Sequence, residues 1–190
     1  MPRAGLDAAT VTEAGAALAD EIGLDRLSMS LVAERLGVKT PSLYKHVDSL
    51  AALTHHIAVV GANEVGDALR DAMQGVAGKD ALAAAAQTLR SYVKKHPGRY
   101  AATTGARPMD PDDPLVPALE RTLGSLGAVL HGYQLDPGDT IHALRMLRSV
   151  LHGFVTLDDS DAFQIDTNID ESFTWMIGFI DQGLRARASA

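Results

Sequence analysis

The chain has 190 residues, a formal net charge of −7 and no cysteine. The lack of cysteine excludes disulfide frameworks, thiol nucleophiles and cysteine-ligated zinc. Hydrophobic residues make up 46% of the chain but aromatic residues only 5%. Because alanine is frequent and is the best helix former, this composition favours helices. The acidic charge argues against a protein coated in nucleic acid, so a DNA-binding surface would have to be a local patch.

Neither an export signal nor a membrane span is visible in the sequence. The N-terminus lacks a basic stretch leading into an apolar core. The two longest uncharged runs, 49–63 and 122–135, are short and interrupted by polar residues or glycine. We therefore expect a cytoplasmic protein.

The first two helices have clear start and stop signals. Apolar residues at helical spacing predict a helix over 6–22, with Asp7 as its N-cap and Gly23 at its C-terminal end. Ser28 can cap a second helix, and Gly37 is expected to end it.

A short third helix and a longer fourth helix follow. The third is predicted over 40–47, with Pro41 in the first turn, where a missing N–H costs nothing. Asp48 is a good cap for the fourth helix, which should run toward Met73.

The rest of the chain also has a helical pattern. The further predicted helices are 80–96, 99–105, 115–133, 139–155 and 168–185. A proline-rich loop over 107–114 separates the second and third of these. Because β-branched residues are scattered and do not alternate, we predict an all-α fold. It would consist of a three-helix N-terminal domain over 1–48 and a helical bundle over 49–190.

Two short helices joined by a turn containing glycine are typical of a helix-turn-helix. Leu43 and Val47 would face inward in the second of these helices. The residues on its other side are small, polar or basic and could lie in the major groove: Lys39, Thr40, Ser42, Lys45 and His46.

Residues 27–38, followed by Pro-Ser-Leu-Tyr-Lys-His-Val at 41–47, resemble the signature of the TetR family of transcriptional regulators. The resemblance implies that Tyr44 and neighbouring basic side chains contact phosphates. It also implies that the short polar side chains approach bases. The DNA-binding residues expected on this basis are Ser30, Lys39, Thr40, Pro41, Ser42, Tyr44, Lys45 and His46.

Two positions depart from the family pattern and remove positive charge. Ser30 stands where many relatives carry a basic residue, and Leu50 stands where many carry a lysine. Between Arg35 and Val47, however, three basic residues occur without an acidic one. A thin basic patch is therefore expected.

The second half resembles one C-terminal subclass of the same family, over His-Pro-Gly-Arg-Tyr at 96–100, residues 148–157, Phe163 and residues 170–173. Its hallmark is a His-Gly pair in the penultimate helix. The resemblance implies an effector site inside the C-terminal helices, for which we select Tyr92, Tyr100, Arg107, Met109, Met146 and His152. For a dimer interface through the last two helices we select Gly153, Phe173, Trp175, Ile177 and Ile180.

Other kinds of site find little support in the sequence. His55 and His56 are adjacent and would point in different directions on a helix, so we expect no metal site there. No phosphate loop, nucleophile elbow or zinc-protease motif is present, and we expect neither an enzyme nor a cofactor.

The sequence thus predicts a homodimeric repressor that binds a palindromic operator in double-stranded DNA and is released by a small-molecule effector. One alternative is a constitutive DNA-binding regulator without a ligand. The other is a helical enzyme or adaptor that uses the helix-turn-helix as a protein interface.

Overall fold

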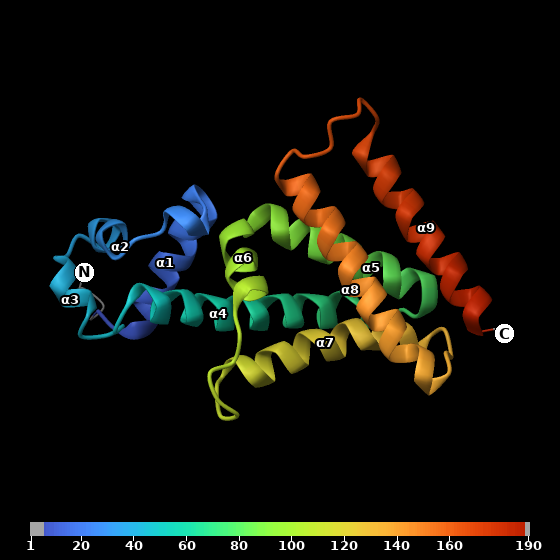
Figure 1. Cartoon of the computed structure of the whole chain (residues 1–190), viewed down its shortest axis with the longest axis horizontal. Helices are drawn as coiled ribbons and strands as arrows, with labels where there is room; N and C mark the ends of the chain where they lie inside the picture. Colours follow the sequence, from blue (N-terminus) through green and yellow to red (C-terminus); the bar gives the residue numbers. More distant parts are fainter. Residues whose placement is uncertain (1–5, 189–190) are drawn as a thin grey trace. The chain divides into compact units, whose positions relative to one another are not determined.

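The computed structural model describes residues 6–188, and within that range the chain contains helices and no strand (Figure 1). This confirms the predicted all-α fold. The elements are α1 (Ala8–Ile22), the 3-10 helix η1 (Leu24–Arg26), α2 (Met29–Leu36), α3 (Thr40–Leu43), α4 (Leu50–Ala72), α5 (Gly78–Lys95), α6 (Pro97–Gly105), α7 (Leu115–His131), α8 (Pro137–Asp159) and α9 (Ile169–Ala188). In the described range no helix is long and apolar enough to cross a membrane.

The chain divides into two compact units, each built from two chain segments. The first unit contains Met1–Glu64 and Lys95–Ala118, and the second contains Val65–Lys94 and Leu119–Ala190. Helix α6 therefore belongs to the same unit as α1, α2 and α3. The functional division between 1–48 and 49–190 stays a prediction.

The local signals at the start of the first unit act as predicted. Asp7 caps α1, because its side chain accepts a hydrogen bond from the backbone N–H of Thr10 at 2.7 Å. This hydrogen bond, helped by the charge of His46, lowers the pKa of Asp7. Gly23 ends the helix with a φ of +90°, a conformation that suits glycine.

The start of α4 differs by one residue from the prediction. The backbone N–H of Ala52 donates to Oγ of Ser49 at 3.0 Å, so Ser49 is the capping side chain and Asp48 is not. Both residue types are good caps, and local sequence alone does not distinguish between neighbours. Leu53, Ile57 and Ala58 of α4 are then fully buried in the first unit.

Helices α1 and α6 make an unusually close contact within the first unit. A Cβ atom added to Gly98 would lie 2.2 Å from the carbonyl carbon of Ala19. Only glycine permits backbones to approach this closely. The contact holds α6 directly against the helix that supports the helix-turn-helix.

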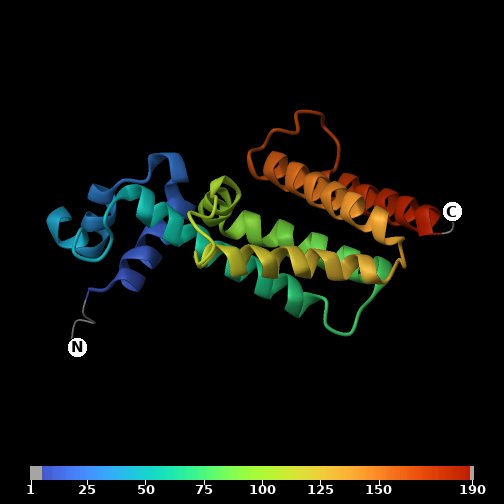
Figure 2. The same cartoon turned by 60° about the horizontal axis from the view of Figure 1, so that its bottom comes forward.

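In the second unit, α8 and α9 run side by side in opposite directions (Figures 1 and 2). One face of the pair is buried within the chain. Its side chains are Leu147, Leu151, Val155, Phe173, Ile177, Ile180 and Leu184. Tyr133, in the turn that follows α7, is also buried, and its hydroxyl donates to Asp181 at 2.8 Å.

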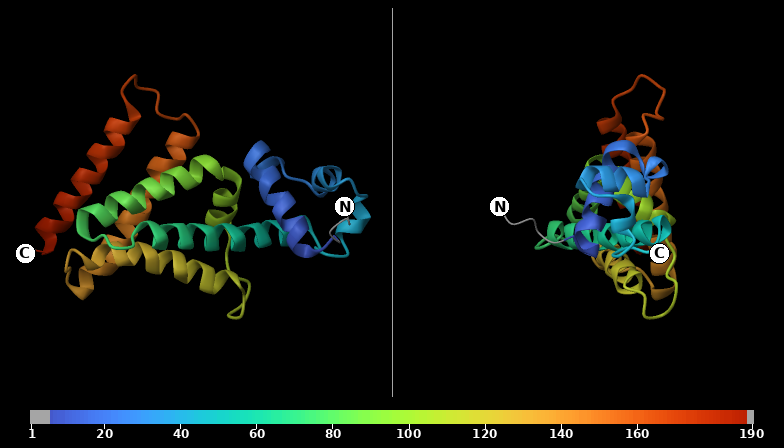
Figure 3. Two further views of the ribbon diagram at one scale, coloured as in Figure 1. Left: turned by 180° about the vertical axis from the view of Figure 1, so that it is seen from behind. Right: turned by 90° about the vertical axis from the view of Figure 1, so that its left-hand side faces the viewer.

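Arg90 of α5 anchors both ends of the loop between α8 and α9, which Figure 3 shows as a projecting segment. Its Nε donates to Asp158 at 2.7 Å and its Nη1 donates to Asp170 at 2.6 Å. The guanidinium group also lies over the ring of Phe173, 4.8 Å from the centroid. The hydrogen bond to Asp158 outweighs burial and raises the pKa of Arg90.

Candidate nucleic-acid interface

The turn between α2 and α3 is built as the sequence predicts. Gly37 adopts the left-handed conformation, with a φ of +65°. Its N–H donates to the carbonyl of Glu34, and the N–H of Val38 donates to the carbonyl of Ala33, both at 3.0 Å. These bonds close the C-terminal end of α2 and set the direction of the next helix. At the other end Ser28 caps α2 by accepting from the N–H of Leu31 at 3.3 Å.

Helix α3 is shorter than predicted. It ends at Leu43, whereas the sequence suggested Val47. The N–H groups of His46 and Val47 both donate to the carbonyl of Leu43, so the chain continues as a tight turn. Leu43 is fully buried and Val47 is 2% exposed. The predicted inward side is therefore confirmed although the helix end is not.

The residues selected for DNA binding occupy the outer side of this segment. Five of them are exposed: Ser30, Lys39, Pro41, Tyr44 and Lys45. The other three are half-buried: Thr40, Ser42 and His46. Tyr44 is 49% exposed, which shows that its ring is not a core residue. The surface presents ammonium and hydroxyl groups, the donors that contact phosphates and base edges in DNA complexes.

The position of Arg35 in the sequence suggested that it adds to the basic patch, but in the structure its side chain is paired with Glu21. Its Nη1 donates to Oε1 of Glu21 at 2.6 Å, and its Nη2 contacts Oε2 of the same carboxylate. This two-point pairing connects α2 to α1. The positive charge of the outer surface therefore comes from Lys39 and Lys45.

Comparisons with known proteins identify the family. Residues 4–57 match the family described as bacterial regulatory proteins, tetR family, and residues 82–180 match the tetracyclin repressor-like C-terminal domain. The chain belongs to the TetR family. It is a helix-turn-helix transcriptional regulator that binds DNA. The matches confirm that both halves belong to the family, whereas the C-terminal subclass with a His-Gly pair stays a prediction.

Two curated regulators resemble this TetR-family chain over nearly its whole length. The HTH-type transcriptional regulator Rv0681 of Mycobacterium tuberculosis is 34% identical over 187 residues, covering 98% of this chain and 85% of that protein. The HTH-type transcriptional regulator YobS of Bacillus subtilis is 30% identical, covering 96% and 95%. Among solved structures, a TetR variant from Acinetobacter baumannii AYE in complex with minocycline has a TM-score of 0.71 at 25% identity, covering 96% and 99%.

A buried arginine, which was not selected from the sequence, connects α6 to α1 and α4 in this TetR-family chain. Arg99 of α6 donates from its backbone N–H and its Nε to Asp20 at 2.9 and 3.0 Å. Its Nη1 donates to Glu64 at 2.7 Å and its Nη2 to Glu13 at 2.5 Å. Burial lowers the pKa of Arg99, but the three carboxylates more than offset this and raise it.

A second polar contact anchors the loop after α6 to α4. Nε2 of His55 lies 2.9 Å from Oδ1 of Asp113, whose side chain is 1% exposed. The backbone N–H groups of Met109 and Leu115 also donate to this carboxylate and, with His55, lower its pKa to about 2. Among residues 6–188 no group of three or more His, Cys, Asp or Glu side chains could hold a metal ion.

The residues selected for an effector site are divided between the two units. Tyr100, Arg107 and Met109 belong to the first unit, on α6 and the loop after it. The other three belong to the second: Tyr92 on α5, and Met146 and His152 on α8. Met109 lines a groove of the first unit and Met146 lines a groove between α8 and α9.

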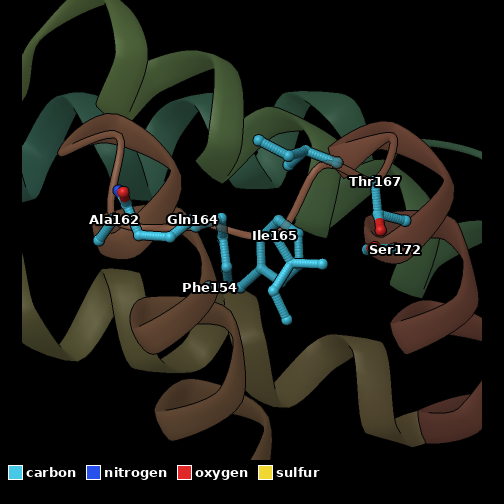
Figure 4. Close-up of a pocket in the computed structure, with 8 residues that line it drawn as sticks. Phe154, Ala162, Gln164, Ile165, Thr167 and Ser172 are labelled. Carbon is cyan, nitrogen blue, oxygen red and sulfur yellow. The ribbon is translucent and has the colours of Figure 1, made fainter.

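A hollow of about 450 Å³ lies beneath the loop between α8 and α9, and Figure 4 shows the side chains that line it. Phe154 of α8, Ile165 of the loop and Ser172 of α9 lie around it. The ring of Phe154 contacts the rings of Phe163 and Phe173, with centroids 5.0 Å apart in each case. The hollow is therefore mostly apolar, and none of the residues selected from the sequence lines it.

Of the residues selected for a dimer interface, Gly153 lies on α8 and the other four lie on different sides of α9. Phe173, Ile177 and Ile180 are buried within the chain, whereas Trp175 is 70% exposed. Phe179, which is 64% exposed, stacks on Trp175 with ring centroids 5.4 Å apart. The outer side of α9 thus carries a large apolar surface.

Proposed function

We propose that this TetR-family regulator is a homodimeric repressor that binds a palindromic DNA site through α3 and is released by a small, largely apolar effector. As a regulator acting on DNA, it would work in the cytoplasm. The observation that carries the proposal is the capped helix-turn-helix, in which buried Leu43 and Val47 leave Tyr44 and Lys45 exposed.

The roles proposed for individual residues follow from their chemistry. Lys39 and Lys45 would contact phosphates through their charge, Tyr44 would donate a hydrogen bond to a phosphate, and His46 would lie near a phosphate or a base edge. Thr40, Pro41 and Ser42, in the first turn of α3, would approach bases, and Ser30 would lie near the backbone from α2. Since Lys39 and Lys45 supply the charge among the described residues of this surface, we propose that non-specific affinity is modest.

A dimer is supported by the apolar surface on the outer side of α8 and α9. A groove of about 650 Å³ between these helices is lined by Met146, Val150, Trp175 and Phe179, among others. Exposed apolar patches of this kind mark interaction surfaces. A second copy of the same helix pair would cover this surface in a symmetric arrangement, and the dimer would have two helix-turn-helix units for DNA. Gly153 would permit a close helix crossing, since a Cβ there meets nothing within 4 Å in the single chain.

Release by an effector is supported by the similar fold of the TetR variant that binds minocycline. The residues selected from the sequence, Tyr92, Tyr100, Arg107, Met109, Met146 and His152, stay the candidates for contacting it. A ligand would lower DNA affinity only by the difference between its affinities for the two conformations.

The proposal is tested by three measurements on one purified sample. Light scattering at micromolar concentration should give the mass of a dimer, and a gel shift at low salt should show bound DNA. A thermal-shift screen should find compounds that stabilise the protein and release DNA over the same concentration range. DNA binding without any releasing compound would favour the constitutive regulator, and a monomer that binds no DNA would refute the proposal.

A further inference from the structure

A groove of about 720 Å³ lies within the first compact unit, between α1, α4 and the loop joining α6 to α7. Its apolar part comes from Val59 and Val60 of α4, Ala9 of α1 and Met109 of the loop. Met109 is 75% exposed and Ala9 is also exposed, so this part is open to solvent. Neither the proposed DNA contacts nor the surface of α8 and α9 uses the groove, and of the residues selected for an effector site Met109 alone is among its described lining residues.

The ionisable groups along the groove have an acidic bias. Glu13, Asp110, Asp112 and Asp113 line it, together with His55 and His56, and the described residues of its lining include no lysine or arginine. Arg99 offsets the charge of Glu13, and His55 hydrogen-bonds to Asp113.

The two remaining acids of the groove, Asp110 and Asp112, are exposed on the loop. The backbone N–H of Asp112 donates to Oδ1 of Asp110 at 2.9 Å, which holds the two residues together. They set the charge at the edge of the groove.

We propose that this groove binds a bulky, apolar organic cation. The apolar body of the cation lies against Val59, Val60 and Met109, and its charge faces Asp110 and Asp112. An anion of the same shape would meet like charges, and a neutral molecule would gain nothing from them. A delocalised charge is favoured because a compact ammonium group would lose more hydration on entering an apolar site.

The probes are tetraphenylphosphonium and tetraphenylborate, two ions of nearly equal size and shape but opposite charge. Their binding to the full chain is measured by calorimetry in sodium buffer without DNA. The test is therefore independent of the proposed function. We expect the cation to bind in a one-to-one ratio to each chain and the anion not to bind. Raising the salt concentration from about 20 to about 500 mM should weaken binding of the cation, because salt screens its attraction to the carboxylates.

Two pairs of variants locate the site. The double variant Asp110→Asn with Asp112→Asn removes two charges while keeping the Oδ1 acceptor. It should lower the affinity for the cation about tenfold. Asp25→Asn with Glu34→Gln removes the same charge from exposed positions outside the groove and should change little.

The second pair adds a charge at exposed helical alanines. Ala9→Lys places a positive charge inside the groove and should lower the affinity for the cation at least as much as the double Asp110→Asn, Asp112→Asn variant does. Ala101→Lys, at an exposed position of α6 outside the groove, should leave binding of the cation unchanged. Equal binding of the two probes, no binding of either, or equal responses within both variant pairs would overturn the proposal.

Discussion

Arg35 on α2 and Glu21 on α1 form a two-point ion pair, in which Nη1 of Arg35 lies 2.6 Å from Oε1 of Glu21. The hydrogen bond from Arg35, more than the charge, lowers the pKa of Glu21. A guanidinium group paired in this way cannot at the same time grip a phosphate with the same donors. The pair therefore withholds one positive charge from the surface beside α3.

Replacing the acid of this pair should release the arginine for DNA. In Glu21→Gln we expect tighter binding to DNA of any sequence and a steeper salt dependence, by about one unit of slope. Asp25→Asn removes the same charge from an exposed position without freeing an arginine. Salt titrations of DNA binding by both variants measure the difference, and an equal gain in both would show that only overall charge matters.

Phosphate contacts and base contacts should respond differently to substitution. Lys45→Ala should weaken binding to all sequences and flatten the salt dependence by about one unit of slope, because one phosphate contact is lost. Thr40→Ala and Ser42→Ala should instead change which bases are preferred. Lys79→Ala, at an exposed lysine of the second unit, is the control. Unchanged affinity of Lys45→Ala at low and moderate salt would reject the placement of α3 in the groove.

Two glycines of α6 should give opposite results when replaced by alanine. Gly98→Ala forces a Cβ atom to 2.2 Å from the backbone of Ala19, so we expect a loss of unfolding free energy of about 3 kcal/mol or more. At Gly105 a Cβ meets nothing within 4 Å, and Gly105→Ala should stabilise by about 0.5 kcal/mol. Denaturant unfolding of the two variants measures both. Equal stability would mean that α6 does not pack closely on α1.

The Asp113 carboxylate should make stability depend on pH in the acid range. Its pKa is lowered from 3.8 to about 2 in the folded chain, chiefly by the N–H of Met109 and then by that of Leu115. A lowered pKa contributes stability that is fully present above about pH 4 and is lost as the pH falls toward 2. The difference in unfolding free energy between wild type and Asp113→Asn should therefore shrink over that range. The difference for Asp112→Asn, at an exposed neighbour, should stay small throughout, and a constant difference for Asp113→Asn would contradict the assignment.

The local features of the fold were predictable because a few adjacent residues determine them. Asp7, Ser28 and Gly37 act at helix ends through backbone groups at most four residues away, and all three do as predicted. Where two adjacent residues could both cap a helix, as with Asp48 and Ser49 before α4, the sequence could not show which of them does so. The end of α3 was missed because the turn after Leu43 keeps the same inward side chains as a continued helix.

Contacts between distant residues were not predictable in the same way. Arg35 pairs with a residue 14 positions away, and Arg99 reaches Glu13 across 86 positions, so no spacing rule applies. In α9 the helical spacing of apolar residues predicted an apolar stripe, but it did not tell whether that stripe is covered by the same chain or by a second copy. The structure shows that Phe173 is buried within the chain while Trp175 stays exposed.

The central claim is that α3 of a symmetric dimer reads DNA, and sequencing the fragments that the purified protein selects from a random pool tests it most directly. We expect enrichment of two inverted copies of one short sequence, with centres about 10 base pairs apart or a multiple of that spacing. The same selection with Lys45→Ala should yield fewer fragments but the same sequence, because a phosphate contact carries no base preference. Selected fragments with the composition of the starting pool, or with a single unrepeated site, would contradict the account.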